Sequence, residues 1–123
     1  MISPYFKLGF ECENTARELR RLERGRRPNL FLIEDGEKII KNLKQFLLES
    51  DNIHYEKQVL YQKLILDDEI NTKNSLEDVS QVVDSILEGE KPLKDYLKTS
   101  IAFFENMSDK CLSYANFDAN TYN

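Results

Sequence analysis

The chain has 123 residues, enough for one domain around a single core, and its apolar content of 41% is too high for a disordered chain. The net charge of −5 argues against a general nucleic-acid coat, which needs a basic field. The same charge suits a partner with a basic surface.

The N-terminal third predicts one helix and leaves its flanks open. Residues 13–24 fit a helix with Asn14 or Thr15 as its N-cap. Residues 5–10 and the apolar run 30–33 fit a short N-terminal β-ribbon, and the second run also fits a buried connector. Residues 1–35 therefore carry the weakest pattern in the chain.

The middle of the chain predicts an amphipathic helix followed by an ambiguous segment. In residues 37–50, apolar side chains recur at three- and four-residue steps, and Asp35 precedes them as a cap. Residues 53–66 fit a helix, although their second half is also rich in strand-forming residues; we favour the helix. Residues 67–74 predict a polar loop.

Two more helices complete the pattern. Ser75 and Asp78 resemble a capping box, and Gly89 ends the apolar periodicity that follows them. Pro92 suits the first position of a last helix of about six turns, and residues 116–123 predict a frayed tail. We expect a mainly α fold: one domain, residues 1–123, forming a compact bundle of four to five helices, with the N-terminal ribbon left open.

Enzymatic chemistry has little support in the sequence. His54 is the only histidine and lies in no metal-binding motif. Cys12 and Cys111 have no CxxC neighbour, and we favour two buried free thiols over a disulfide between them. The acidic run 67–69 lacks the spacing and glycine of a calcium loop. We therefore expect no enzymatic activity, no metal and no cofactor.

Targeting signals are also absent from the pattern. Residues 1–10 lack the charged and apolar regions of a signal peptide, and no apolar run approaches the ~20 residues that span a bilayer. We expect a cytoplasmic protein without membrane contact. Nothing in the sequence indicates an oligomeric state.

All the arginines of the chain lie within eleven residues, which we call the arginine segment. They are Arg17, Arg20, Arg21, Arg24, Arg26 and Arg27. On a helix the first four share one face, whereas Leu19 and Leu22 fall on the opposite side. Gly25 is expected to end the helix and to leave the last two arginines at its negative pole. The planar guanidinium group binds carboxylates and phosphates with two parallel hydrogen bonds, so the segment predicts an anion-binding or partner-binding site.

Two interpretations of these arginines remain open. They bind an external anion or partner, or they pair internally with nearby acids such as Glu18, Glu23 and residues 34–37. The charge is uneven: residues 1–27 carry seven cations and four acids, whereas residues 28–123 carry ten lysines and eighteen acids. The basic segment is thus attached to an acidic body.

The leading functional hypothesis is a small, acidic, non-enzymatic binding protein. It would sequester or inhibit a macromolecular partner, as immunity proteins, antitoxins and phage-encoded inhibitors do, and would contact a protein partner through the arginine segment. The alternative is a nucleic-acid or nucleotide binding module that uses the same arginines. Aromatic residues for stacking on bases are absent from residues 11–30.

Overall fold

The structure is a computed structural model that describes residues 3–48, 55–65 and 69–122. Five helices occupy these residues: α1 (Pro4–Glu23), α2 (Leu30–Leu48), α3 (Tyr55–Ile65), α4 (Glu69–Leu87) and α5 (Lys94–Tyr122). The predicted mainly α fold is confirmed, and the described part of the chain contains no strand.

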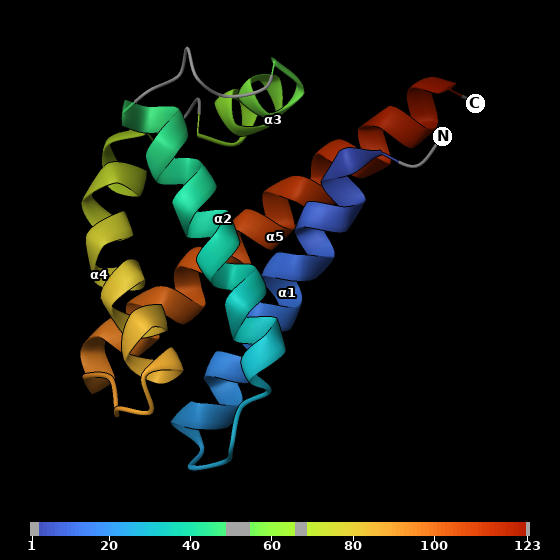
Figure 1. The fold of residues 1–123 in the computed structure, drawn as a ribbon. Helices are drawn as coiled ribbons and strands as arrows, with labels where there is room; N and C mark the ends of the chain where they lie inside the picture. Colours follow the sequence, from blue (N-terminus) through green and yellow to red (C-terminus); the bar gives the residue numbers. More distant parts are fainter. Residues whose placement is uncertain (1–2, 49–54, 66–68, 123) are drawn as a thin grey trace.

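The helices form a bundle in which α1 and α5 make the most extensive contact. These two run antiparallel, so that the first turn of α1 lies beside the C-terminal half of α5 (Figure 1). Helices α2 and α4 pack on each other, and each also contacts one member of the first pair. The shorter α3 lies at one end, against α2 and α5. The α1–α2 and α4–α5 connections both lie at the opposite end.

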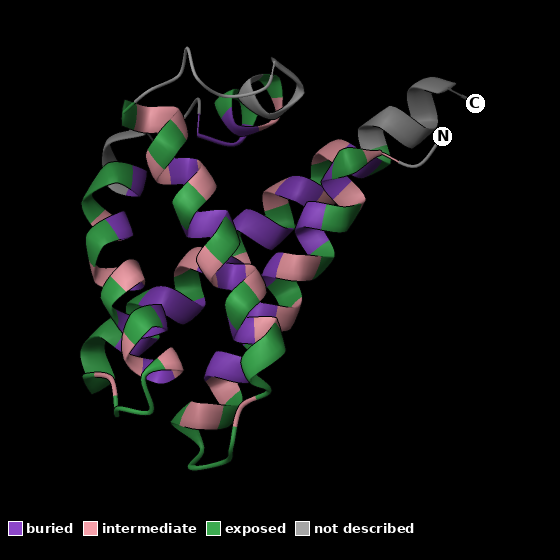
Figure 2. Cartoon of the chain, in the orientation of Figure 1, coloured by how far each residue is buried: buried purple, intermediate pink, exposed green. Residues whose placement is uncertain are grey.

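The core lies where the four long helices face one another, and the residues coloured as buried follow those faces (Figure 2). Its largest fully buried side chains come from every helix: Leu19, Ile33, Leu43, Leu64, Val79, Val82, Val83 and Phe104. Helix α3 is held at its last turn by α5, because Lys110 donates to the Leu64 carbonyl (3.3 Å) and Tyr114 to the Lys63 carbonyl (3.3 Å). Carbonyls in the last turn of a helix have no partner within the helix, so these side chains satisfy them.

Helix α1 starts earlier than the sequence predicted. It begins at Pro4, and the Ser3 side chain accepts a hydrogen bond from the backbone N–H of Tyr5 (3.3 Å). Proline is favoured at the first helical position because its missing N–H would have no partner there. The expected N-caps Asn14 and Thr15 lie inside the helix, and residues 5–10 are helical instead of forming a ribbon.

Helix α2 also starts earlier, which removes the second half of the expected ribbon. It begins at Leu30, and the Asn29 side chain accepts a hydrogen bond from the Phe31 N–H (3.0 Å). Asp35, the expected cap, therefore lies inside the helix. The apolar run 30–33 is the first turn of α2, so it is neither a strand nor a connector.

The C-terminal half contains further corrections. Residues 69–74, expected as loop, are helical, and Ser75 lies inside α4 because buried residues on both sides of it continue the same face. Helix α5 begins two residues after Pro92, where the Leu97 N–H donates to the Leu93 carbonyl (2.9 Å). The helix continues to Tyr122 and so includes residues 116–122, where the sequence predicted a polar tail.

Two other expectations for this half are confirmed, and some of its residues lie outside the described part of the chain. The helix favoured for residues 53–66 is confirmed over 55–65. Gly89 ends α4 with a φ of 80°, as predicted. Ile53, His54 and residues 67–68 lie outside the described part of the chain.

Candidate functional site

The structure places the arginine segment at the C-terminal end of α1 and in the turn that follows. Gly25 adopts a φ of 78° and ends the helix, as predicted. The Arg26 N–H donates to the Arg21 carbonyl (2.9 Å), and the Gly25 N–H donates to the Leu22 carbonyl (3.0 Å). This pair of bonds defines a Schellman motif, which gives the turn a fixed backbone path.

Three of the six arginines have acidic partners within the protein. Arg20 of α1 pairs with Glu105 of α5. The Nε atoms of Arg21 and Arg17 lie 3.7 and 4.0 Å from the carboxylate oxygens of Glu18. The arginine side chains of these pairs are partly exposed to solvent, so each pair contributes little to stability. Internal pairing therefore accounts for half of the arginine segment.

The other three, Arg24, Arg26 and Arg27, form no ion pair with any acid in the described residues. All three are exposed. Arg24 is the C-cap residue of α1, and the other two follow Gly25 in the connection to α2. Three guanidinium groups without carboxylate partners thus lie together at one end of the bundle.

Glu18 organises this end of the molecule, a role that the sequence analysis missed. The sequence suggested it only as an acid that could pair with the arginines, whereas the structure shows that it is also buried. Its Oε1 atom accepts a hydrogen bond from the backbone N–H of Asn29 (2.7 Å). The carboxylate therefore ties the end of the connection back to α1, and Asn29 in turn caps α2.

Thr15 makes a second link between α1 and the start of α2. Its Oγ1 atom lies within hydrogen-bond distance of two carbonyl oxygens, those of Glu11 (2.9 Å) and Leu32 (3.0 Å). Its methyl group faces Gly36, where an added Cβ would lie 2.6 Å from Thr15 Cγ2. The absence of a side chain at Gly36 is what allows α1 and α2 to approach this closely.

Two large apolar side chains are exposed directly after the arginines. Leu30 is 48% exposed and Phe31 is 79% exposed, whereas Ile33 in the same turn is fully buried. A four-residue apolar run cannot turn all its members inward on a helix, because successive residues point 100° apart. We call residues 24–31 the α1–α2 tip. It combines three unpaired arginines, two exposed apolar side chains and a backbone fixed by hydrogen bonds.

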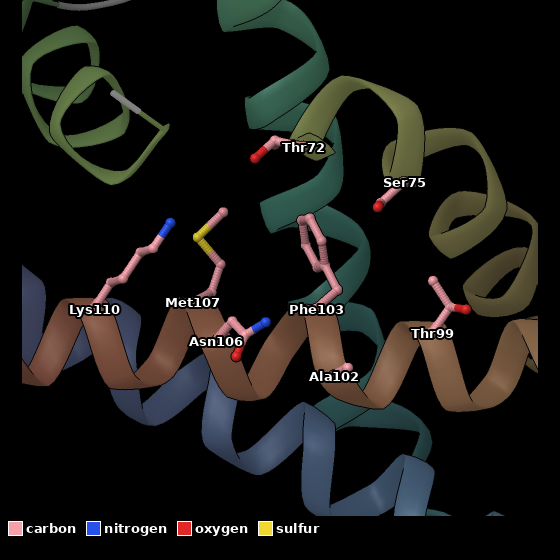
Figure 3. A pocket seen from close by; sticks show the side chains of 8 residues that line it. All are labelled: Thr72, Ser75, Thr99, Ala102, Phe103, Asn106, Met107 and Lys110. Carbon is pink, nitrogen blue, oxygen red and sulfur yellow. The ribbon is translucent and has the colours of Figure 1, made fainter. Parts of the chain in front are cut away.

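A cleft between α4 and α5 lies away from the tip and offers little for recognition. It has a volume of about 360 Å³ (Figure 3). Its lining is mostly hydroxyl, amide and apolar groups: Thr72, Ser75, Thr99, Ala102, Phe103, Asn106, Met107 and Lys110. Its one cation, Lys110, already donates to the Leu64 carbonyl.

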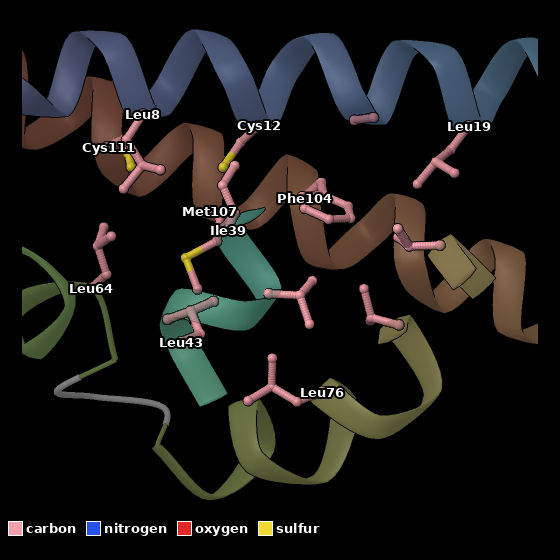
Figure 4. Close-up of a cluster of buried hydrophobic side chains, with 14 of the residues drawn as sticks. Leu8, Cys12, Leu19, Ile39, Leu43, Leu64, Leu76, Phe104, Met107 and Cys111 are labelled. Carbon is pink, nitrogen blue, oxygen red and sulfur yellow. The ribbon is translucent and has the colours of Figure 1, made fainter. Parts of the chain in front are cut away.

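Nucleophilic and metal-binding groups are not assembled in the described residues. Cys12 of α1 and Cys111 of α5 are free and buried in the same core cluster (Figure 4). Burial raises the pKa of Cys12 well above its ordinary value and raises that of Cys111 to about 12, so both are inert thiols. Over residues 3–48, 55–65 and 69–122 no group of His, Cys, Asp and Glu could hold a metal ion. Over the same ranges no helix is both long enough and apolar enough to cross a bilayer.

No known protein family matches the chain, and neither a curated protein nor a solved structure is detectably similar to it.

Proposed function

We propose that this chain is a small non-enzymatic binding protein that sequesters or inhibits a macromolecular partner through the α1–α2 tip. The observation that carries the proposal is the division within the arginine segment. Arg17, Arg20 and Arg21 have acidic partners inside the protein, whereas Arg24, Arg26 and Arg27 are exposed and form no ion pair within the described part of the chain. Exposed guanidinium groups that lie close together in sequence without paired carboxylates favour an anionic partner.

An acidic protein surface suits this tip better than a nucleic acid does. Residues 28–123 carry a net charge of −8, which repels a long polyanion. Three unpaired arginines would make about three phosphate contacts, and the logarithm of the affinity would then fall with that of the salt concentration with a slope of about −3. Such binding is weak at physiological salt. A compact acidic patch on a protein partner, in contrast, contacts the tip without coming close to the acidic residues in the rest of this chain.

The first test uses fluorescence anisotropy with labelled DNA and RNA at low and near-physiological salt. The test variant replaces Arg24, Arg26 and Arg27 with alanine. The control variant replaces three exposed lysines on the other side of the bundle end: Lys91, Lys94 and Lys98. Both variants lose three positive charges, so a difference between their affinities for nucleic acid would show a specific role of the arginines.

We expect no nucleic-acid binding at near-physiological salt. Binding that the arginine variant loses and the lysine variant keeps would instead make the tip a phosphate site, and the protein-partner proposal would be wrong. The direct test is affinity purification from nuclease-treated lysate of cells that carry this gene. One acidic protein should be retained by the unaltered chain and by the lysine variant, and lost by the arginine variant.

A further inference from the structure

We propose that the partner of the α1–α2 tip is a protein surface in which carboxylates flank an apolar patch, and that Phe31 is the central contact. This inference rests on the proposed function and specifies its partner. Among the aromatic side chains whose exposure the structure describes, Phe31 is the most exposed, at 79%, and Leu30 next to it is 48% exposed. Both follow Arg26 and Arg27 by only a few residues.

Single exposed apolar residues are common on protein surfaces and need no special explanation. Leu93, which is 67% exposed in the α4–α5 connection, is such a case. Its neighbours Glu90, Lys91, Lys94 and Asp95 have mixed charges, so no field of one sign surrounds it. The α1–α2 tip differs because its two exposed apolar residues adjoin each other and follow three exposed arginines that form no ion pair in the described residues. The acids Glu34 and Asp35 follow one turn later on α2, so the positive charge lies on the N-terminal side of Leu30 and Phe31.

The backbone of the tip is ordered before any partner binds. The Schellman motif at Gly25 fixes its beginning, and the bond from the Asn29 N–H to Glu18 fixes its end. The Asn29 side chain then caps the turn that carries Phe31. A surface that is already ordered loses less conformational entropy on binding, so the exposed aromatic ring and the arginines are presented at low cost.

The chemistry of the tip favours a protein over a nucleic acid. Aromatic rings and arginines occur in both kinds of interface. Leu30, however, offers aliphatic surface that packs against other apolar side chains and has no π-face to stack on a base. Phenylalanine and arginine are both enriched in protein–protein interfaces, where a few well-packed side chains contribute most of the affinity.

The test is a selection of phage-displayed random peptides against the unaltered protein, followed by affinity measurement with synthetic copies of the selected peptides. We expect selected peptides to combine acidic with large apolar residues. Phe31→Ala should weaken their binding by about tenfold or more. Leu93→Ala is the matched control, because it removes an exposed apolar side chain from the other turn, and it should leave the affinity unchanged. Circular dichroism of each variant checks that the fold is retained.

The outcomes separate this inference from the proposed function. Peptides that depend on Arg24, Arg26 and Arg27 but not on Phe31 would overturn the inference and leave the contact site standing. Peptides that depend on neither would overturn both. Peptides without acidic residues would also overturn the inference. Binding of labelled RNA or DNA that is lost in Phe31→Ala would show that Phe31 stacks on bases. That result would overturn the proposed apolar contact with a protein.

Discussion

Thr15 joins two helices through one hydroxyl and one methyl group. The hydroxyl lies between the carbonyls of Glu11 and Leu32, and the methyl group occupies the space next to Gly36. The side chain is fully buried, so it has no free volume into which it can move. Any atom added at Gly36 therefore displaces either the Thr15 side chain or the helix that carries it.

Gly36→Ala is expected to destabilise the fold by about 1–3 kcal/mol through overpacking. The new Cβ would lie 2.6 Å from Thr15 Cγ2 and 3.2 Å from Phe104 Cζ. This cost opposes the gain of up to about 1 kcal/mol that alanine brings to a helix interior. Urea unfolding followed by circular dichroism measures the difference.

Thr15→Ser provides the matching control, because it removes Cγ2 and keeps the hydroxyl. In that background Gly36→Ala should cost less than it does in the unaltered protein, since the closest clash is gone. An equal cost in both backgrounds would show that the contact between Thr15 and Gly36 does not limit the approach of α1 to α2.

Glu18→Ala is expected to lower the free energy of unfolding by about 1.5–3 kcal/mol, the range for hydrogen bonds to charged groups. The substitution leaves the Asn29 N–H without its acceptor and removes the carboxylate that faces Arg17 and Arg21. Glu23→Ala is the control, because Glu23 is exposed and forms no ion pair in the described residues. Its effect should stay within about 0.5 kcal/mol. Equal effects in urea unfolding would contradict the structural role of Glu18.

At the scale of the helices, α1 and α4 end in the same way. Glycine follows each C-cap with positive φ, 78° at Gly25 and 80° at Gly89. At α4 the Glu90 N–H donates to the Ser85 carbonyl (2.8 Å), which repeats the bond from Arg26 to Arg21. Both helices thus connect to the next helix through a Schellman motif.

Gly25→Ala and Gly89→Ala are each expected to cost about 1–2 kcal/mol, the penalty for a left-handed conformation with a Cβ. An added Cβ at either position meets no atom within 4 Å, so the cost lies in the backbone alone. Asparagine tolerates this conformation better, and Gly25→Asn should cost less than Gly25→Ala. Thermal unfolding of the three variants gives the order, and an equal or reversed order would contradict the backbone explanation.

The helix ends were predictable from sequence, whereas several helix starts were not. A glycine after an amphipathic run requires no knowledge of the fold, and Gly25 and Gly89 both ended their helices as expected. Ser75 looked like a cap, but Thr72 and Leu76 are both buried on one face of α4, and packing carries the helix through it. At α1 the signal was present, because Ser3 and Pro4 form a standard start, but the residues that follow them, 5–10, were interpreted as a possible ribbon.

The candidate site was predictable in position and not in its interactions. Helical spacing placed Arg17, Arg20, Arg21 and Arg24 on the side of α1 away from Leu19, which is fully buried. The partner of Arg20, Glu105, lies 85 residues away in sequence, and no local pattern connects them. The burial of Glu18 depends on how the connection folds back onto α1. The exposure of Phe31 likewise followed only once the run 30–33 was seen to be helical.

For the molecule as a whole, the buried thiols predict a loss of stability in alkali. The pKa of Cys111 is raised by burial from its ordinary value of 9.0 to about 12, and that of Cys12 is raised in the same direction. The folded state therefore favours the neutral thiols. Below about pH 9 this preference is fully present, and above it the unfolded chain ionises first. The free energy of unfolding should then fall by up to about 1.4 kcal/mol per pH unit for each thiol.

Urea unfolding at several values between neutral and about pH 10 tests this slope. Cys12→Ala and Cys111→Ala should each make the pH dependence shallower, whatever they do to stability at neutral pH. Ellman's reagent gives an independent readout, since both thiols should react only as fast as the protein unfolds. Rapid reaction of either thiol in the folded protein would contradict its burial.

The position of the tip also affects how the molecule is oriented as it approaches a partner, before contact. Arg24, Arg26 and Arg27 form no ion pair in the described residues and follow one another closely at one end of the bundle, in a chain whose net charge is −5 (Figure 1). Such an uneven distribution of charge is an electric dipole, which the net charge alone does not describe. At low ionic strength a negatively charged surface exerts a torque on this dipole and turns the arginine end forward. At about 0.1 M salt the Debye length is about 10 Å, so the molecule is oriented only when it is within about that distance of the other surface.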